Sequence, residues 1–463
     1  MTKPLVKLPQ EARDFLKAHP GIESVDAIFA DLSGILRGKR YPIDYLAKLY
    51  GGEVAMPASV YLLDTMGASH DPGGFGFSDG DPDAAVRVVP GSLKPVPWAA
   101  RPTCQLMTTL VIADGATDDG APYPYEPRNV LARVAARFAE LELTPVVAME
   151  LEFYLIDPKR TEAGAPQPPI SPLTGTRDTG TQVYGMAEVT AFDALLDEVA
   201  KACAAQDVPV GATTAEYAPG QYEINLQHVD DPLLAVDHSV LFKRALKAVA
   251  QRHGVRASFM AKPYLDQAGS GLHMHLSLLD RGGRNVFDGG PAPASAALEH
   301  AVGGVLATLP ESMAILAPNV NSFRRFQPNL FVPIRRSWGF ENRSTALRIP
   351  LGRGAARRIE HRVAGADANP YLALAAFLAG VHHGLTHKIA PPPPFEGNAG
   401  FARDTDLPFR LRPALARLRE SEVLADYFGA EYPGLYAACK SAELDAFENH
   451  IDAREYAWYL QPE

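Results

Sequence analysis

The segment AMELEFYLID, residues 148–157, constrains the fold more than any other part of the chain, because its alternation is typical of a β-strand. Successive side chains of a strand point to opposite faces. Met149 and Leu151 would therefore share one face, while Glu150 and Glu152 share the other. Two neighbouring carboxylates on an apolar strand most often lie on a solvated sheet face. Whether these two belong to a site instead depends on the other acidic segments.

Two further segments can also bring side chains together in pairs. His273 and His275 are two residues apart in GSGLHMHLSLLD, which has the alternation of a strand. Glu216 and Glu223 flank YAPGQY, whose Pro-Gly pair can turn the chain and bring the two carboxylates together. Glu360 adds another acid in RRIEHR. Each pair alone is more often structural, but five carboxylates with one or two imidazoles suit Mg2+ or Mn2+ better than zinc.

Arginine is concentrated between residues 324 and 362, where ten occur in a chain whose formal net charge is -10. Guanidinium groups bind carboxylate and phosphate oxygens through paired donors, and divalent ions with arginines are what phosphoryl transfer requires. We expect about half of these arginines to form structural ion pairs. No Walker A sequence and no kinase glycine loop occurs. Phosphates would therefore be held by metal ions and arginines.

Composition limits the class of protein. The acidic net charge argues against a general nucleic-acid binder. Cys104, Cys203 and Cys439 are far apart, so we expect neither a disulfide framework nor a zinc–thiolate site, and we expect a reducing, cytoplasmic location. The N-terminal segment lacks the apolar core of a signal peptide. The longest apolar stretch, 371–385, contains two histidines and is expected to be a buried helix rather than a membrane span.

The length of 463 residues predicts at least two domains. Strand-like segments at 25–34 and 104–115, separated by Gly- and Pro-rich loops, indicate a small N-terminal domain at 1–121. The proline-rich stretch 121–129 is the expected boundary. Strands that alternate with helices then indicate a larger α+β domain at 122–463.

Six segments, in this order, resemble the glutamine synthetase family: MELEFYLID, EYAPGQYEINL, KPYLDQAGSGLHMHLSL, NSFRRFQP, ENRSTALRIP and RRIEHRVAGADANPYLALAA. The resemblance implies that family's α+β fold, with a small N-terminal β-grasp-like domain and a large catalytic α/β domain built on an antiparallel sheet. It also implies a homo-oligomer, expected to be a dodecamer of two hexameric rings, with each active site between neighbouring subunits. The partners would be small molecules, with no nucleic acid and no membrane.

The motifs that match the family imply a role for each residue. One metal ion would be bound by Glu152, Glu216 and Glu223, and the second by Glu150, His273 and Glu360. ATP would be contacted by His275, Ser277, Arg343, Arg348 and Arg358. Glutamate would be bound by Glu152, Gly269, Arg325 and Arg362.

The activity that the resemblance implies is ATP-dependent ligation of L-glutamate to an amine. The γ-carboxylate of glutamate would attack the γ-phosphate of ATP and give ADP and γ-glutamyl phosphate. An amine would then displace phosphate and form an amide. Mg2+ or Mn2+, two or more ions per site, would be the cofactors. Arg343, Asp31 and Glu216 are the expected catalytic residues, and Asp31 would reach the amine pocket of a neighbouring subunit.

The expected amine pocket departs from the ammonia-using pattern of the family. Six residues after Arg325, where a glutamate would help to deprotonate ammonium, the chain has Phe331. A phenyl ring accepts no proton, but it can pack against an alkyl chain or an ammonium group. Asp31, Tyr184 and Phe331 would line the pocket, and Glu341 is a candidate partner for a second ammonium. These departures resemble the γ-glutamyl-polyamine and γ-glutamyl-amine synthetase branch, so polyamines such as putrescine or spermidine are expected first and monoamines second.

Two alternatives stay open. One is a true glutamine synthetase that uses ammonia, and the other is a ring-forming scaffold or sensor without catalysis. A silent relative would be expected to lose metal ligands, yet all six ligand positions are filled here. Replacement of Glu152 separates an enzyme from a scaffold, because a scaffold has no turnover to lose.

Overall fold

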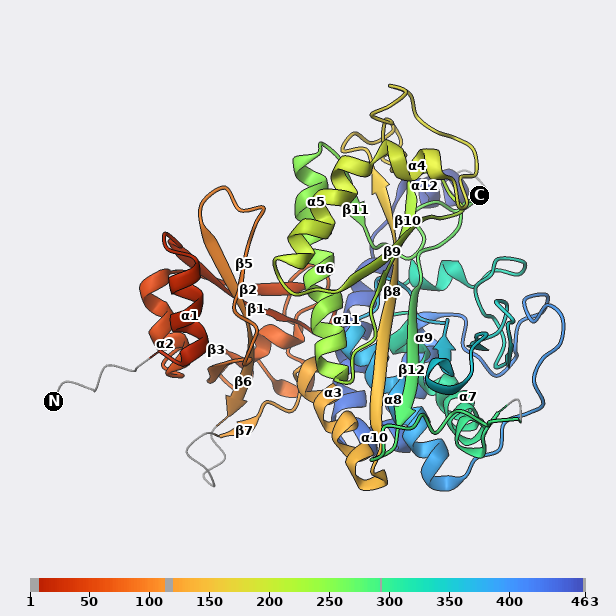
Figure 1. Ribbon diagram of the computed structural model, residues 1–463. Helices are drawn as coiled ribbons and strands as arrows, with labels where there is room; N and C mark the ends of the chain where they lie inside the picture. Colours follow the sequence, from red (N-terminus) through yellow and green to blue (C-terminus); the bar gives the residue numbers. More distant parts are fainter. Residues whose placement is uncertain (1–7, 113–119, 292–293, 461–463) are drawn as a thin grey trace.

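The computed structural model describes residues 8–112, 120–291 and 294–460 and contains two β-sheets with helices around them (Figure 1). The N-terminal sheet has seven strands in the order β2-β1-β6-β4-β3, and β5 and β7 both pair with β6. β1 and β6 run parallel, and the other pairs are antiparallel. Its elements are α1 (Gln10–Ala18), β1 (Ser24–Ala30), β2 (Leu36–Pro42), α2 (Leu46–Tyr50), β3 (Ala55–Pro57), β4 (Asp83–Val88), β5 (Lys94–Pro95), β6 (Thr103–Ile112) and β7 (Ala121–Pro122).

The large sheet has eight strands in the order β13-β14-β15-β12-β8-β10-β9, with β11 paired to β8. It is antiparallel as expected, except that β13 and β14 run parallel. Its strands are β8 (Thr144–Ile156), β9 (Val210–Ala215), β10 (Gln221–Leu226), β11 (Arg256–Ser258), β12 (Leu272–Leu279), β13 (Trp338–Phe340), β14 (Leu347–Ile349) and β15 (Ile359–His361).

The helices that accompany the large sheet follow the sequence pattern closely, and the apolar stretch at 371–385 forms the buried helix that was predicted there. Their bounds are α3 (Pro127–Ala136), α4 (Met186–Ala191), α5 (Asp193–Ala204), α6 (Pro232–Arg252), α7 (Ala296–Leu316), α8 (Pro370–His387), α9 (Leu411–Arg419), α10 (Glu422–Phe428), α11 (Tyr432–Glu448) and α12 (Ala453–Tyr459). Within the described residues, none of these helices is both long and apolar enough to cross a bilayer.

Strand β8 confirms the alternation predicted for residues 148–157. Leu151 and Phe153 are fully buried, and the Phe153 ring meets that of Phe242 on α6 edge to face, with centroids 6.3 Å apart. α6 therefore covers one face of the sheet, and Glu150 and Glu152 lie on the other. The large sheet thus buries its apolar face on a helix and keeps the acidic face for a site.

The turn predicted around YAPGQY joins β9 to β10 as an antiparallel hairpin. Gly220 has a φ of +76°, and a Cβ at this position would lie 2.7 Å from the carbonyl oxygen of Leu155. Glycine is required here both by the left-handed backbone and by the close approach to β8. The hairpin therefore fixes how β10 lies along β8.

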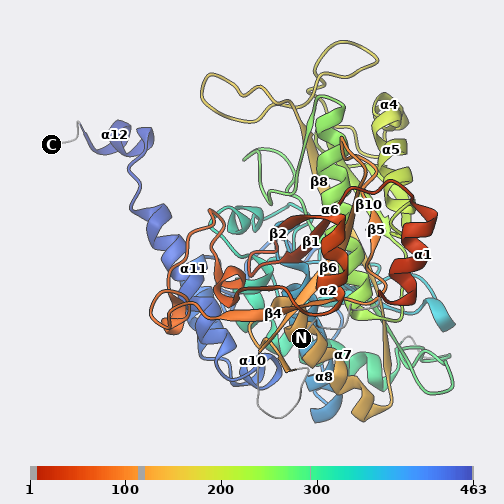
Figure 2. The ribbon, with the colours of Figure 1, turned by 90° about the vertical axis from the view of Figure 1, so that its left-hand side faces the viewer.

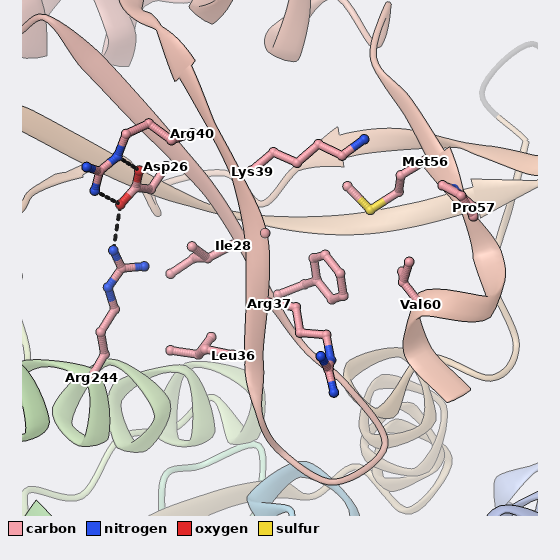
Figure 3. Close-up of a pocket in the computed structure, with 12 residues that line it drawn as sticks. Asp26, Ile28, Leu36, Arg37, Lys39, Arg40, Met56, Pro57, Val60 and Arg244 are labelled. Carbon is pink, nitrogen blue, oxygen red and sulfur yellow. Dashed lines mark hydrogen bonds and ion pairs between the residues drawn. The ribbon is translucent and has the colours of Figure 1, made fainter. Parts of the chain in front are cut away.

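An ion-pair cluster joins the N-terminal sheet to the helix that covers the large sheet (Figure 3). Asp26 on β1 accepts two hydrogen bonds from Arg40 on β2, at 2.6 and 2.9 Å, and one from Arg244 on α6, at 2.6 Å. A second link is made by Asn369, whose Nδ2 donates to the backbone oxygens of Asp31 and Leu32. The division into domains at residues 1–121 and 122–463 stays a prediction.

Candidate active site

The register of three strands gathers predicted site residues on the acidic face of the large sheet. β12 places His273 directly opposite Glu150 of β8. On the other side of β8, β10 places Glu223 opposite Glu152. Because residues two apart share a face, His275 lies on this face as well. Side chains from three separate segments thus form one cluster.

The outer strands add two more acids and an arginine. β15 places Glu360 opposite His275, and β14 places Arg348 opposite Glu360. Glu216 follows β9 directly, at the start of the hairpin. Its carboxylate is close enough to Glu152 for that charge to act on its pKa. All six predicted metal ligands are therefore part of one region.

Glu150 lies at the centre of the cluster. One of its carboxylate oxygens is 2.8 Å from Nε2 of His275, and the other is 3.2 Å from Nδ1 of His273. The same Nδ1 atom is 4.0 Å from Glu223, and Nε2 of His273 is 4.0 Å from Glu152. The ligand atoms form two groups, and within each group they lie within 4.8 Å of one another. One group is Glu150 with His275 and Glu360, and the other is Glu150 with Glu223 and His273.

Burial and crowding change how these acids titrate. Burial raises the pKa of Glu223 to about 9, with a further contribution from the charges of Glu150 and Glu152. Burial likewise raises the pKa of Glu216 to about 7, where Glu152 adds to the shift and Arg343 opposes it. Burial also acts to raise the pKa of Glu150, but the neighbouring imidazoles outweigh it and hold that pKa well below its usual range. The cluster therefore has an excess of negative charge.

The donor set fits hard divalent cations. Carboxylate oxygens dominate it, with imidazole nitrogens as the other donors, and the sulfur ligands that favour zinc are missing from both groups. The grouping differs from the predicted one in two ways: Glu223 lies with Glu150 and His273, and His275, expected beside ATP, lies with Glu150 and Glu360. The assignment of ligands to two separate ions stays a prediction.

Several of the predicted phosphate-binding arginines line the same region. Arg348 donates to Glu360 at 2.7 Å and to Glu341 at 3.3 Å, and Arg358 donates to His275 at 3.1 Å. Arg343 is exposed, and its charge reaches Glu216. Glu341 is thus held by an arginine, which leaves it poorly suited to the second-ammonium role considered for it.

Arg325 has the geometry expected of a ligand for a carboxylate. Its side chain is only 2% exposed, and Nη1 donates to the backbone oxygen of Val363 at 3.0 Å. Its buried Nε has no hydrogen-bond partner among the described residues. Gly269 lies against it, since a Cβ at Gly269 would be 2.7 Å from Cγ of Arg325. Arg362 is the neighbour of Val363 in the chain and is hydrogen-bonded to Glu360. A buried guanidinium with an unused donor is a natural anion site.

Asp31 lies in a closed turn of the N-terminal sheet. Its carboxylate is fully buried in the turn after β1, where it accepts hydrogen bonds from the backbone of Ser33 and Ile35 at 2.9 Å and from Arg37 at 2.6 Å. The catalytic and amine-pocket roles of Asp31 stay predictions.

The remaining predicted residues occupy different environments. Tyr184 and Phe331 are 67% and 75% exposed, as surface residues that meet a substrate or another subunit could be. Ser277 is buried, and its hydroxyl donates to the backbone oxygen of Arg357 at 2.8 Å. The amine-pocket and ATP-binding roles of these residues stay predictions.

Two residues of the acidic face were missed. Asn225 lies opposite Glu150 on β10, and its Nδ2 donates to Glu223 at 3.3 Å. Its two-residue spacing from Glu223 was a signal that could have found it. The His228 ring lies edge to face with that of His275 at 6.1 Å, and burial lowers its pKa to about 4. His228 lies beyond the end of β10, so no strand periodicity pointed to it.

The chain is similar to several known proteins. The model of the glutamine synthetase catalytic domain matches residues 124–459. The gamma-glutamylputrescine synthetase of Escherichia coli is 42% identical over 98% of this chain and 94% of its own length. The glutamate–isopropylamine ligase of a Pseudomonas species is 32% identical over 97% of both chains. A solved structure of ligand-free GmaS superposes with a TM-score of 0.81, at 27% identity, over 96% of this chain and 98% of its own.

The chain belongs to the glutamine synthetase family and has its fold. The predicted family and the predicted α+β fold are thereby confirmed. Relatives named for joining glutamate to amines agree with the predicted activity of an ATP-dependent glutamate–amine ligase.

Proposed function

We propose that this protein is an ATP-dependent ligase that joins the γ-carboxylate of L-glutamate to an organic amine, through a γ-glutamyl phosphate intermediate. One observation carries the proposal: two groups of potential metal ligands share Glu150 beside Arg348 and Arg358. Clustered acids for divalent ions next to cationic donors are what phosphoryl transfer to a carboxylate requires.

Each part of the site has a separate task. Glu150, Glu223, His273, His275 and Glu360 would hold Mg2+ or Mn2+, with Glu152 and Glu216 beside them. The ions, when bound, neutralise phosphate charge. Arg343 and Arg348 bind phosphate oxygens as charge shifts during transfer. Arg325 and Arg362 bind the carboxylates of glutamate. Glu216 is the carboxylate beside Arg343 that takes the proton lost by the attacking amine.

An organic amine is favoured over ammonia by Phe331. The ring is 75% exposed, so it is available to a substrate, and it cannot attract NH4+ as a carboxylate would. A polyamine of the putrescine type is the first candidate, supported by the 42% identity to a gamma-glutamylputrescine synthetase, and an alkyl monoamine is the second. The pocket would hold the alkyl chain on Phe331 and Tyr184.

A ring-shaped homo-oligomer, expected to be a dodecamer, is part of the proposal. Helix α12 extends away from the body of the protein (Figure 2). At its end, the side chains of Trp458, Tyr459 and Leu460 are 61%, 68% and 71% exposed. Large apolar side chains on a projecting helix are costly in water and suit burial against a second copy of this chain. The cytoplasmic location stays a prediction.

The test is phosphate release from ATP with L-glutamate and a panel of amines: putrescine, spermidine, isopropylamine, ethanolamine and ammonium. Turnover that depends on glutamate, on an organic amine and on a divalent ion supports the proposal. Turnover with ammonium alone would identify a glutamine synthetase instead. Absence of turnover with every amine, together with intact assembly, would favour the scaffold.

A further inference from the structure

A cavity of about 710 Å³ lies between helix α6 and the turn that follows β1. Its walls are the turn at 33–36, one side of α6, residues 257–260 and the loop 366–368. Four cationic side chains line it, against a single carboxylate: Lys243, Arg244, Lys247 and Lys440, with Asp367 as the acid. The cavity is thus positively charged in a chain whose net charge is -10.

Two of the four cations are neutralised within the protein. Arg244 donates to Asp26 at 2.6 Å. Lys440 donates to Glu443 at 3.0 Å and to the hydroxyl of Ser33 at 2.8 Å. These two groups therefore form part of the wall and do not need a ligand.

Lys243 and Lys247 are in a different position. Neither forms an ion pair within 4.0 Å with a carboxylate of the described residues. Lys243 donates to the backbone oxygen of Ala366 at 2.7 Å, and both ammonium groups lie over the ring of Phe259, at 5.0 and 5.6 Å from its centroid. Burial, with the charge of Lys247, lowers the pKa of Lys243 to about 7. Lys243 is half-buried and Lys247 is exposed, so the unpaired ammonium of Lys243 carries a cost that an anion would offset.

The carboxylate of Asp367 forms no ion pair within 4.0 Å with either lysine, although its charge acts to raise the pKa of Lys243. Its Oδ2 atom accepts hydrogen bonds from Asn319 at 2.8 Å and from Ser322 at 2.7 Å. It thereby fixes the loop that follows β15 to the segment before Arg325. The space beside the two lysines is left to a molecule from outside the chain.

We propose that this cavity binds a small organic anion with at least two acidic oxygens, held between Lys243 and Lys247. The apolar part of the ligand would contact Trp98, Phe259 and Met260, which line the same space. A carboxylate and a phosphate monoester share this chemistry, and binding measurements distinguish them. A half-buried ammonium group such as that of Lys243 binds such anions more strongly than an exposed lysine does.

A short path of contacts leads from the cavity to the active site. The backbone oxygen of Ala366 accepts a hydrogen bond from Lys243. The backbone N–H of Ala366 donates to the backbone oxygen of Ser270 at 3.0 Å. The next residue, Gly271, donates its N–H to Glu152 at 2.7 Å. An anion that draws Lys243 away from Ala366 would alter the support of Glu152. Binding is therefore expected to change the KM for glutamate, a consequence that rests on the proposed function.

The binding test is isothermal titration calorimetry of the full-length protein at pH 7 and constant ionic strength. The probes are succinate, citrate, adenosine monophosphate and inorganic phosphate. Saturable binding of succinate or citrate assigns the site to carboxylates, and binding of adenosine monophosphate alone assigns it to phosphate esters. Affinity should fall roughly tenfold or more in Lys243→Met, whose lysine is half-buried, and should fall less in Lys247→Met, whose lysine is exposed.

Two control variants locate the binding. Lys201→Met removes an exposed lysine from α5 and should leave affinity unchanged. Arg343→Ala should also leave it unchanged, which separates this cavity from the phosphate-binding arginines. Binding that persists in both Lys243→Met and Lys247→Met, or that is lost in Arg343→Ala, overturns the proposal. So does binding of inorganic phosphate alone, or of no probe at all. Calorimetry reads these outcomes even if the protein shows no ligase turnover.

Discussion

Glu152 on β8 and Glu223 on β10 lie directly opposite each other in an antiparallel pair, and both point to the same face of the sheet. Like charges opposite each other destabilise a sheet. Here the repulsion is relieved in part because burial raises the pKa of Glu223 to about 9, so that this acid retains its proton. The relief is only partial, so the acidic face keeps negative charge that a bound cation would neutralise.

Addition of a divalent ion is expected to stabilise the fold. A cation that binds the native cluster and not the unfolded chain raises stability by mass action, by about 2.7 kcal/mol at a hundredfold excess over Kd. The thermal unfolding midpoint should therefore rise when Mg2+ or Mn2+ replaces chelator, and Na+ at equal ionic strength should have no such effect. An unchanged midpoint with both ions would contradict the metal assignment.

Replacement of Glu152 by Gln should separate stability from activity. The substitution removes the charge of Glu152, which acts on Glu216 and Glu223, so the metal-free protein should unfold at the same or a higher temperature. Turnover with ATP, glutamate and amine should fall about a hundredfold or more, because metal sites tolerate little disturbance even in their supporting residues. Glu162→Gln, in an exposed loop, is the matched control and should keep full activity. Equal turnover in both variants would exclude Glu152 from the site.

Removal of the Asp26 carboxylate should weaken the junction between the two sheets. Burial acts to raise the pKa of Asp26, but hydrogen bonds from Arg40 and Arg244 outweigh it and hold that pKa below 3.8. A carboxyl whose pKa is lower in the folded state stabilises the protein above the unfolded value, and this contribution is lost as pH falls through the folded value. Asp26→Asn should therefore lower stability at pH 7 by about 2–4 kcal/mol, and by less as the pH falls below 3.8.

Thermal unfolding across this pH range checks the prediction for Asp26. Asp197→Asn is the control, because the pair of Asp197 with Lys201 is exposed on α5 and contributes little to stability. A difference between Asp26→Asn and the unchanged protein that grows as the pH falls would contradict the assigned sign.

Strand periodicity predicted which side chains share a face. The two-residue spacing of Glu150 and Glu152, and of His273 and His275, was sufficient for that. It could not predict that β8 lies between β10 and β12, because pairing joins segments far apart in the chain. The position of His275 beside Glu150 depends on that pairing, so its place in a ligand group was missed. Asp31 shows a second limit: a motif identifies a residue, but only the packing around Arg37 reveals that its carboxylate is buried.

The choice of amine is expected to change with Phe331. Phe331→Glu replaces a side chain that is 75% exposed by a carboxylate, so folding should be almost unaffected. A carboxylate there attracts ammonium and can take its proton, whereas the alkyl chain of an organic amine loses its apolar contact. The ratio of kcat/KM for ammonium to that for putrescine should therefore rise, by roughly tenfold or more for about 1.4 kcal/mol of altered transition-state binding. Phosphate release with each amine measures it.

The matched control for Phe331 is Phe447→Glu, which places the same charge on an exposed phenylalanine of α11. This variant should keep the amine preference of the unchanged protein, because α11 takes no part in the acidic face. If both variants shift the ratio equally, the effect comes from net charge and not from a contact with the amine. If neither does, Phe331 does not line the amine pocket, and selection for an organic amine must come from other residues.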